Sequence, residues 1–534
     1  MELRKICSII MLCAIAVSAM AIPARRGGVV RTAADGTQKM VFLHGDETFH
    51  YMTDADGNWL EETSLLPMSA ETQKVRQANG AARLKVRKIQ QETKVGTTPN
   101  IAPRGLVILV SFKDKAFATP KETIDEMMNG DNFARNYTYK YSYNGRIFTE
   151  HIQSSGSARK YFQDQSYGQY NPQFDVVGPY TVSQNYSYYG ANDYNGDDKY
   201  PDKMIQEACK LANADGADFT LYDNDNDGKV DFVYVIYAGY GEADGGAANT
   251  IWPHNYALSY TNAIITLDDK KIDNYACSNE IQYASDMYNG IGTFCHEFSH
   301  VMGLPDLYCT SQSYSSPHTL MEWDILDYGP YNNDGNTPPA YSAYERFFCG
   351  WITPRVMTDP ENVSLVNLNT SKEALLLCSG DKHNLVGYNP NPTTFYLLEN
   401  RQKEGWDAYL PGKGMLITKI QYSSSKWENN TVNNSSRAMG VDILEATSNT
   451  TSTAKATDAF PAGATEWTDF SGHEVTDITL GSDGVIRFLY RGGSGQGVED
   501  VADPAAKVEK VMKNGQVMII KNGKKYTVTG QEIR

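Results

Sequence analysis

The residues with the strongest chemical signal are His296, Glu297 and His300, which stand in the order His-Glu-Phe-Ser-His. On an α-helix, two histidines four positions apart lie on one face and can present nitrogen atoms to the same zinc ion. The glutamate between them is placed to reach the water that such a metal activates rather than the metal itself. The spacing therefore predicts a zinc-dependent hydrolase, with His296 and His300 as metal ligands and Glu297 as the general base.

A helix over residues 291–302 would hold these three side chains in place. At about 100° per residue, with His296 taken as zero, His300 falls near 40° and Glu297 near 100°. The apolar side chains fall on the opposite face: Ile291, Phe294, Cys295, Phe298, Val301 and Met302. A buried helix whose histidines make only structural hydrogen bonds is the simpler alternative, but nothing structural requires a glutamate between them. We expect an amphipathic helix that packs its apolar face on the core.

The residues after the helix suggest a third metal ligand. Gly303 can adopt the positive φ that ends a helix and turns the chain back, which would bring Asp306 beneath the metal. The pattern His-Glu-x-x-His-x-x-Gly-x-x-Asp belongs to the metzincin group, with Asp in place of the commoner third His. A gluzincin-like arrangement, in which a later glutamate such as Glu322 or Glu399 is the third ligand, remains the main alternative.

The stretch 292–308 resembles the immune inhibitor A family of secreted bacterial metallopeptidases. Further matching segments are 251–254, 323–329, 341–346 and 398–402, so the resemblance spans roughly residues 100–480. It implies an α+β fold with a zincin-type, metzincin-like catalytic domain at 101–352. It also implies a secreted zinc endopeptidase that acts on protein or peptide substrates.

In this family a Met-containing turn lies beneath the zinc, and the resemblance places that turn at residues 323–329. Leu326 stands where the family usually has Met, a swap that conserves volume and apolarity and so affects packing rather than metal binding. Tyr328, just past this turn, is a candidate to hydrogen-bond the oxyanion that forms during peptide hydrolysis. Lys419 stands where relatives often have His, and we assign it no catalytic role.

A second metal site is predicted in an acidic loop. Acidic residues occupy positions 1, 3, 5 and 9 of this loop, with Gly228 at position 6 for the tight turn: Asp223, Asp225, Asp227 and Asp231. Position 12 is Tyr234 rather than a carboxylate, so the loop is not an EF-hand. We expect structural Ca²⁺ here, and an Asp/Asn-rich turn without metal is the alternative.

A cysteine-protease interpretation is excluded for Cys295, although it adjoins His296. Adjacent helical residues point about 100° apart, so the two side chains cannot form a thiolate–imidazole pair. Six cysteines remain after residue 21, and the sequence does not choose among the 15 ways in which they could pair: Cys209, Cys277, Cys295, Cys309, Cys349 and Cys378. A buried thiol or a disulfide is expected at Cys295.

The first 21 residues are typical of a secretory signal peptide. Arg4 and Lys5 precede an apolar run over 6–17, and Ala-Met-Ala at 19–21 offers a small-x-small cleavage site. A short N-terminal anchor is the alternative. We expect the mature protein to be secreted or held at the cell surface.

Residues 22–100 are expected to form an inhibitory prosegment. Alternating runs separated by Asp35-Gly36 and Asp56-Gly57 predict a small β module. The basic stretch 74–94 is interpreted as an exposed linker, with Arg87-Lys88 open to an activating protease, and a solvated helix is the alternative. The chain after residue 100 carries 35 basic and 54 acidic residues, so a mildly basic segment precedes a strongly acidic body. This charge complementarity predicts a zymogen.

The remaining chain divides into three parts. Continuous apolar runs at 106–112 and 232–237 predict buried strands of the catalytic domain. Short β runs separated by turn residues predict a β-rich module at 353–491, followed by a Gly-rich linker. The basic β tail at 498–534 resembles the end of the C-terminal sorting domains of the Bacteroidetes type IX secretion route, which would make secretion machinery a partner.

Composition excludes several other functions. The 534 residues are 41% hydrophobic and carry a net charge of −16, whereas a nucleic-acid-binding protein needs a basic face. Beyond the signal, no apolar stretch reaches the roughly 18 residues of a membrane span. A non-catalytic surface adhesin is the rival from another class, and the intact Glu297 argues against it.

Overall fold

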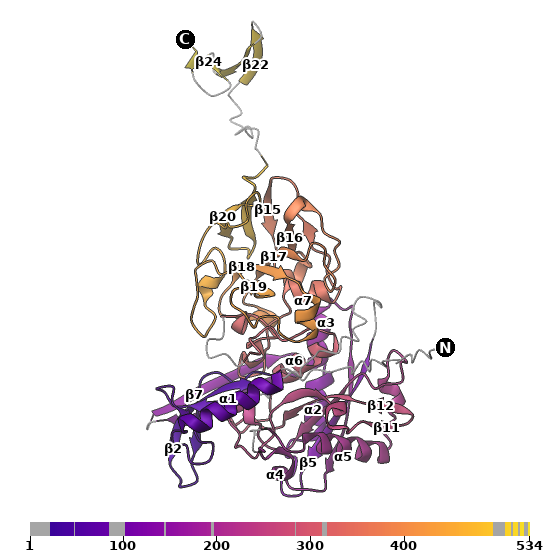
Figure 1. Ribbon diagram of the computed structural model, residues 1–534. Coiled ribbons are helices and arrows are strands. Elements are labelled where there is room, and N and C mark those ends of the chain that lie inside the picture. Colours follow the sequence, from indigo (N-terminus) through magenta and orange to yellow (C-terminus); the bar gives the residue numbers. More distant parts are fainter. Residues whose placement is uncertain are drawn as a thin grey trace, which may run out of the picture.

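The computed structural model describes residues 22–46, 49–84, 102–143, 146–193, 197–283, 285–311, 318–494 and the strands between 508 and 533. The predicted signal peptide at 1–21, the proposed cleavage site Arg87-Lys88 and residues 495–497 of the Gly-rich linker lie outside the described residues. Figure 1 shows a small N-terminal module beside a mixed α and β region, a β-rich module above both, and a separate C-terminal sheet.

A five-stranded mixed sheet forms the centre of the 102–352 region, in the order β10-β13-β9-β5-β8. The edge strand β10 is antiparallel and the other four run parallel. The strands are β5 (Arg104–Ser111), β8 (Gln173–Thr181), β9 (Val233–Tyr237), β10 (His254–Ala257) and β13 (Asn274–Asn279). β5 and β9 are almost wholly buried, which confirms both predicted strands.

Helices cover both faces of this sheet because alternate residues of β5 point to opposite sides. Val107 and Leu109 pack with α2, α3 and α6, whereas Leu106 and Ile108 pack with α5. The α-helices of this region are α2 (Lys121–Asn129), α3 (Ala158–Gln165), α4 (Tyr186–Gly190), α5 (Pro201–Ala214), α6 (Gly292–Val301) and α7 (Ala343–Phe348). The 3-10 turns are η1 (Phe219–Tyr222), η2 (Glu242–Asp244), η3 (Leu258–Thr261), η4 (Met321–Trp323) and η5 (Gly329–Tyr331).

Two hairpins complete the region. They are β6 (Ala134–Tyr143) with β7 (Arg146–Ser155), and β11 (Ile265–Leu267) with β12 (Lys270–Ile272).

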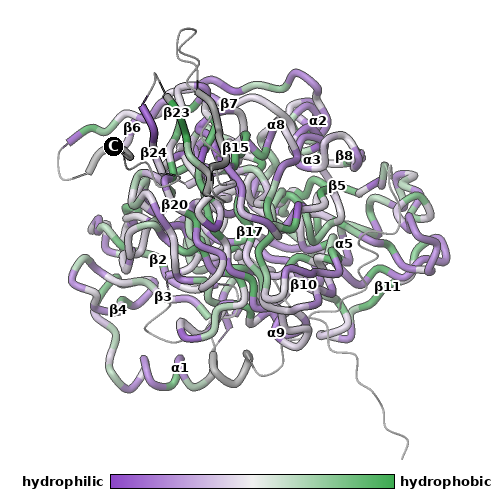
Figure 2. The backbone as a smooth tube through the Cα atoms, turned by 90° about the horizontal axis from the view of Figure 1, so that it is seen from above, coloured by the Kyte–Doolittle hydropathy of each residue, from purple (hydrophilic) through white to green (hydrophobic). Residues whose placement is uncertain are grey.

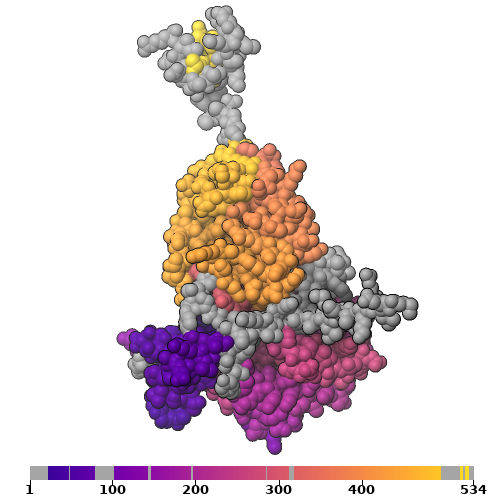
Figure 3. All heavy atoms as spheres, viewed as in Figure 1, coloured from indigo at the N-terminus to yellow at the C-terminus, as the bar shows by residue number. Residues whose placement is uncertain are grey.

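The N-terminal module is a four-stranded antiparallel sheet in sequence order, with one helix after it. Its elements are β1 (Gly28–Thr32), β2 (Gln38–Asp46), β3 (Phe49–Thr53), β4 (Trp59–Leu60) and α1 (Ala70–Leu84). Gly36 and Gly57 have positive φ at the two predicted turns. The linker interpretation was wrong for 74–84, where the solvated-helix alternative holds, since α1 continues to Leu84. In Figure 3 the module, in indigo, lies against the magenta sheet region.

The C-terminal module consists of two sheets packed around a common apolar cluster. One sheet holds β14 (Arg355–Val356), β16 (Leu375–Cys378), β17 (Thr394–Arg401), β18 (Gly414–Gln421) and β19 (Val441–Ile443). The other holds β15 (Glu361–Leu365), β20 (Val475–Leu480) and β21 (Ile486–Tyr490). Its short helices and turns are α8 (Leu368–Ser371), α9 (Ser424–Glu428), η6 (Ser379–Asp381), η7 (Gly405–Asp407) and η8 (Ala456–Asp458).

The tail forms its own antiparallel sheet from β22 (Val508–Lys513), β23 (Gln516–Lys521), β24 (Lys524–Thr527) and β25 (Glu532–Ile533).

One apolar core joins the 102–352 region to the β-rich module. Phe294 and Phe298 of α6 belong to the same buried cluster as Leu376, Leu397 and Trp427. Figure 2 shows green, hydrophobic segments, β5 among them, towards the middle of the molecule and purple, hydrophilic segments mostly around them. Within the described ranges, no helix is both long and apolar enough to cross a bilayer.

Candidate metal centre

The helix α6 carries the predicted metal ligands at the centre of the molecule. Its apolar face packs on the sheet side: the Phe298 ring lies 4.9 Å from the Phe162 ring and 4.9 Å from the Phe232 ring. The helix ends where predicted, because Gly303 has a φ of +78°. The chain then returns beneath the helix and buries Asp306 completely. The structure therefore brings His296, His300 and Asp306 together.

The three ligand atoms form a compact triangle. His296 Nε2 lies 3.3 Å from His300 Nε2, and Asp306 Oδ1 lies 3.2 Å from the first and 3.4 Å from the second. Ligand atoms about 2.0–2.1 Å from a tetrahedral zinc ion lie about 3.3–3.4 Å from one another. Asp306 Oδ1 is buried and accepts no hydrogen bond from any described residue. The donor set and its spacing fit zinc.

Backbone carbonyls fix the tautomer of both histidines. His296 Nδ1 donates to the Ile325 carbonyl at 2.7 Å, and His300 Nδ1 donates to the Leu304 carbonyl at 2.7 Å. Each Nε2 is thereby left with a lone pair directed at the centre of the triangle, as a metal ligand requires. Ile325 adjoins Leu326, which is fully buried, so the segment that the resemblance placed beneath the metal does lie under His296.

Asp306 is held by Asn430, a residue of the loop after α9. The Asp306 backbone N–H donates to Asn430 Oδ1 at 2.8 Å, and Asn430 Nδ2 donates to Asp306 Oδ2 at 2.6 Å. Burial alone would raise the pKa of the Asp306 carboxyl, but the His300 and His296 imidazoles hold that pKa well below its usual range. Asp306 therefore stays ionised and directs its free oxygen at the histidines. Sequence reasoning missed Asn430, because no motif marks a residue 124 positions away.

Glu297 faces the same space but is not equivalent to the ligands. It is completely buried, and one of its carboxylate oxygens has no hydrogen-bond partner among the described residues. Burial raises the pKa of Glu297 to about 8, against the lowering effect of His296. Its other oxygen accepts a hydrogen bond from the backbone nitrogen of Ile22 at 3.1 Å. The start of the N-terminal module thus reaches the proposed general base.

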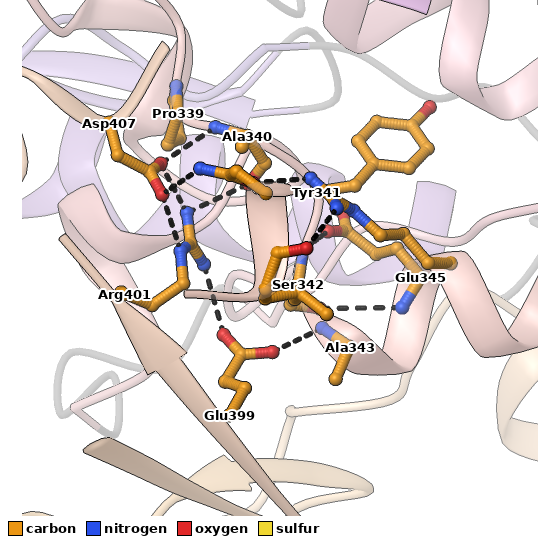
Figure 4. Close-up of polar contacts among 12 residues, drawn as sticks. Pro339, Ala340, Tyr341, Ser342, Ala343, Glu345, Glu399, Arg401 and Asp407 are labelled. Carbon is orange, nitrogen blue, oxygen red and sulfur yellow. Dashed lines mark hydrogen bonds and ion pairs between the residues drawn. The ribbon is translucent and has the colours of Figure 1, made fainter. Parts of the chain in front are cut away.

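The two glutamates of the gluzincin-like alternative are engaged elsewhere. Glu399 of β17 accepts from Arg401 at 3.0 Å and from the Ala343 backbone N–H, and Figure 4 shows this network joining β17 to α7. Glu322 accepts from the Ala454 backbone N–H at 2.7 Å and faces Arg26. Both carboxylates have partners outside the histidine cluster, so the geometry favours Asp306 as the third ligand.

Tyr328 contacts Arg26 of the N-terminal module, a contact that the sequence did not predict. The Arg26 guanidinium stacks over its ring, 3.4 Å from the ring centroid. In this form of the chain, the N-terminal module covers the tyrosine, and its role at an oxyanion stays a prediction.

The acidic loop gathers three of its four predicted calcium ligands. Oxygens of Asp223, Asp225 and Asp227 lie within 4.8 Å of one another. Asp231 instead accepts from the Asn224 side chain and backbone, and Lys270 Nζ lies 2.6 Å from Asp223. A bound cation would compete with the Lys270 ammonium. The calcium site stays a prediction.

Millimolar Ca²⁺ is expected to raise the melting temperature of the full chain, because a cation that binds only the folded state stabilises it by mass action. The rise should be larger in a Lys270→Met variant, in which the competing ammonium is gone. Calorimetry across micromolar to millimolar Ca²⁺ measures both effects. An unchanged melting temperature in both proteins would favour the plain-turn alternative.

All six cysteines among the described residues are free thiols, and none forms a disulfide. Cys295 is buried, and burial raises the pKa of its thiol well above the ordinary value. Of the two expectations for Cys295, the buried thiol is therefore the one that the structure shows.

Comparison with known proteins agrees with this geometry. Residues 91–351 match the family model described as the immune inhibitor A peptidase M6 catalytic domain. This part of the chain is similar to the catalytic domain of the immune inhibitor A family. The match contains all three predicted zinc ligands and Glu297, and the recognition made from the sequence is confirmed.

Two curated relatives align over part of this chain. Immune inhibitor A of Bacillus thuringiensis subsp. alesti is 25% identical over 271 residues, which cover 46% of this chain and 39% of that protein. Pre-pro-metalloprotease PrtV of Vibrio cholerae serotype O1 is 28% identical over 218 residues, 36% of this chain and 23% of that protein. The chain therefore spans less than half the length of either relative.

Proposed function

We propose that this chain is a secreted zinc endopeptidase made as a zymogen. The single observation that carries the proposal is the triangle of His296 Nε2, His300 Nε2 and Asp306 Oδ1, with the Glu297 carboxylate beside it. Hydrolysis of casein by the processed chain, cut near residue 100, with and without a chelator tests it. Substrates would be proteins or peptides.

Each residue of the site would have its own role in peptide hydrolysis. When bound, zinc supplies a Lewis acid that lowers the pKa of water and polarises the substrate carbonyl. Glu297 accepts the proton of the attacking water and delivers it to the leaving amine. Asn430 orients Asp306, and the Ile325 and Leu304 carbonyls orient the histidines.

Support for latency comes from the first residues of the N-terminal module. Ile22 is 1% exposed and its nitrogen occupies the hydrogen-bonding position of Glu297. The predicted cleavage after Ala21 would turn this nitrogen into an α-amino group, whose positive charge strengthens its contact with a carboxylate. While this contact holds, one of the two Glu297 oxygens is bound to the prosegment instead of a substrate. One relative is named as a pre-pro-metalloprotease, which agrees with a signal and a prosegment here.

A second contact between the module and the catalytic region supports the same proposal. The His50 ring stacks on Trp252 at 4.4 Å between ring centroids, and His50 Nε2 lies 3.4 Å from a Glu242 oxygen. Burial lowers the pKa of His50, but Glu242 and Glu62 outweigh it and the net shift is upward. A protonated His50 would therefore tie the module to Glu242.

The full chain is expected to hydrolyse casein much more slowly than the processed chain, because Ile22 blocks Glu297. Full-length protein carrying Arg87→Gln and Lys88→Gln should stay latent under a trypsin-like protease that activates the wild type. The rates of casein hydrolysis before and after protease treatment measure this. Equal turnover by the full-length and processed forms would eliminate the zymogen proposal.

Export and activation complete the proposal. The signal at 1–21 would direct export, the tail at 498–534 would engage secretion machinery, and an activating protease would cut before the catalytic region. Ca²⁺ would be structural. No described contact favours the adhesin alternative over hydrolysis.

A further inference from the structure

The segment 22–26 lies on the catalytic region as an extended peptide would. Trp252 Nε1 donates to the Ile22 carbonyl at 3.3 Å, and the Tyr331 hydroxyl donates to the Pro23 carbonyl at 2.6 Å. The Arg25 backbone N–H donates to the Ala243 carbonyl at 2.9 Å. These contacts use main-chain groups that every peptide has, so the same surface can hold a substrate.

The position of Ile22 defines which half of a substrate this surface would hold. In peptide hydrolysis, the general base returns its proton to the amine of the residue that follows the cleaved bond. The Ile22 nitrogen lies within hydrogen-bond distance of Glu297, as that amine must. Ile22 therefore occupies the place of the first residue after the cleaved bond, and Arg25 and Arg26 occupy the fourth and fifth places.

Arg25 enters a pocket of carboxylates. Its guanidinium lies 2.5 Å from Asp334 Oδ1, and Asp244 also attracts it. Asp244 is 6% exposed, and one of its oxygens has no hydrogen-bond partner in the described part of the chain. Burial raises the pKa of Asp244 to about 7, against the opposing effect of Arg25. When Arg25 departs, this buried carboxyl pair is left without its cation and can bind another one.

Arg26 enters a second acidic site beside the first. Its guanidinium stacks on Tyr328 and lies 3.5 Å from a Glu322 oxygen. The fully buried Asp327 attracts it, and one Asp327 oxygen has no partner within the described ranges. Tyr328, Glu322 and Asp327 thus combine an aromatic face with two carboxylates, a combination that favours guanidinium.

We propose that these two acidic sites bind substrate, so that the enzyme prefers peptides with basic side chains at the fourth and fifth positions after the cleaved bond. This inference rests on the proposed function. The prosegment would then inhibit by imitating the product half of a preferred substrate.

Two peptide substrates test the preference on the processed enzyme. They share one cleavable bond and carry either Arg-Arg or Gln-Gln at the fourth and fifth positions after it. We expect about tenfold or higher kcat/KM for the Arg-Arg peptide, mostly through a lower KM. Asp334→Asn and Glu322→Gln should each reduce that ratio, whereas Asp359→Asn, an exposed position, should leave it unchanged. Equal kcat/KM for both peptides would overturn the proposal.

A binding measurement separates this inference from catalysis. The peptides Ile-Pro-Ala-Arg-Arg-Gly-Gly and Ile-Pro-Ala-Gln-Gln-Gly-Gly are titrated into the processed Glu297→Gln variant. We expect about tenfold tighter binding of the first peptide, with the difference reduced by Asp334→Asn. Tighter binding of the Arg-Arg peptide, together with no casein hydrolysis by the processed wild-type chain, would keep the acidic sites and remove the proposed function. Equal binding of the two peptides, together with normal hydrolysis by the processed wild-type chain, would remove the acidic sites as substrate sites and keep the proposed function.

Discussion

Asp306→Ala is expected to remove zinc from the processed chain and to reduce proteolysis to background. Asp306 Oδ1 completes the triangle with the two histidine nitrogens, and three protein ligands are the usual minimum of a catalytic zinc site. Its loss also removes the carboxylate oxygen that accepts from Asn430 Nδ2, while Asn430 Oδ1 still accepts from the backbone N–H of residue 306. Metal analysis of the purified variant and a casein assay measure the two effects.

Two glutamate variants serve as controls for Asp306→Ala, and Asn430→Ala tests the residue that orients its carboxylate. Glu322→Ala should keep the metal, because its carboxylate contacts Ala454 and Arg26 rather than the histidines. Glu399→Ala should also keep the metal but lower the melting temperature, because the buried Arg401 loses one partner. Asn430→Ala should weaken metal binding about 10- to 100-fold, the usual cost of losing a group that orients a ligand. Zinc kept by Asp306→Ala but lost by a Glu variant would move the protein to the gluzincin-like arrangement.

Glu297→Gln is expected to keep full zinc and to lose about 10²- to 10⁴-fold of the hydrolysis rate, the range of general acid–base catalysis. Glutamine has the same shape and can still accept a hydrogen bond from Ile22, so the fold should be unaffected. The measurement is kcat on casein or a peptide, with zinc content determined on the same preparation.

The matched control for Glu297→Gln is Glu361→Gln, which changes a half-buried carboxylate paired with Arg355, far along the chain from the histidine cluster. It should leave both zinc content and kcat unchanged. Full activity in Glu297→Gln with full zinc would show that another group is the general base.

The sequence predicted the local part of the site well. The His-Glu-x-x-His spacing, the apolar face of α6 and the positive φ of Gly303 are all properties of one short segment, where helical geometry decides which side chains meet. The buried strands β5 and β9 followed from continuous apolar runs for the same reason. Short-range periodicity is enough for such features.

Long-range contacts could not be predicted in this way. Asn430 reaches Asp306 across 124 positions, and Ile22 reaches Glu297 across 275. Neither residue belongs to a pattern of its own, so only the packed structure reveals them. The same limit applies to Lys270, which arrives from β12 to pair with Asp223 in the predicted calcium loop. The excess of basic residues at 74–84 was interpreted as an exposed linker, but these residues are the later part of helix α1.

The zinc dependence of hydrolysis by the processed chain is the most direct test of this account. Zinc per chain and the rate of casein hydrolysis are measured on one preparation before dialysis against a chelator, after it, and after zinc is restored. We predict about one zinc per chain at the start, parallel loss of metal and activity, and recovery of both. Unchanged hydrolysis by metal-free protein would contradict the account.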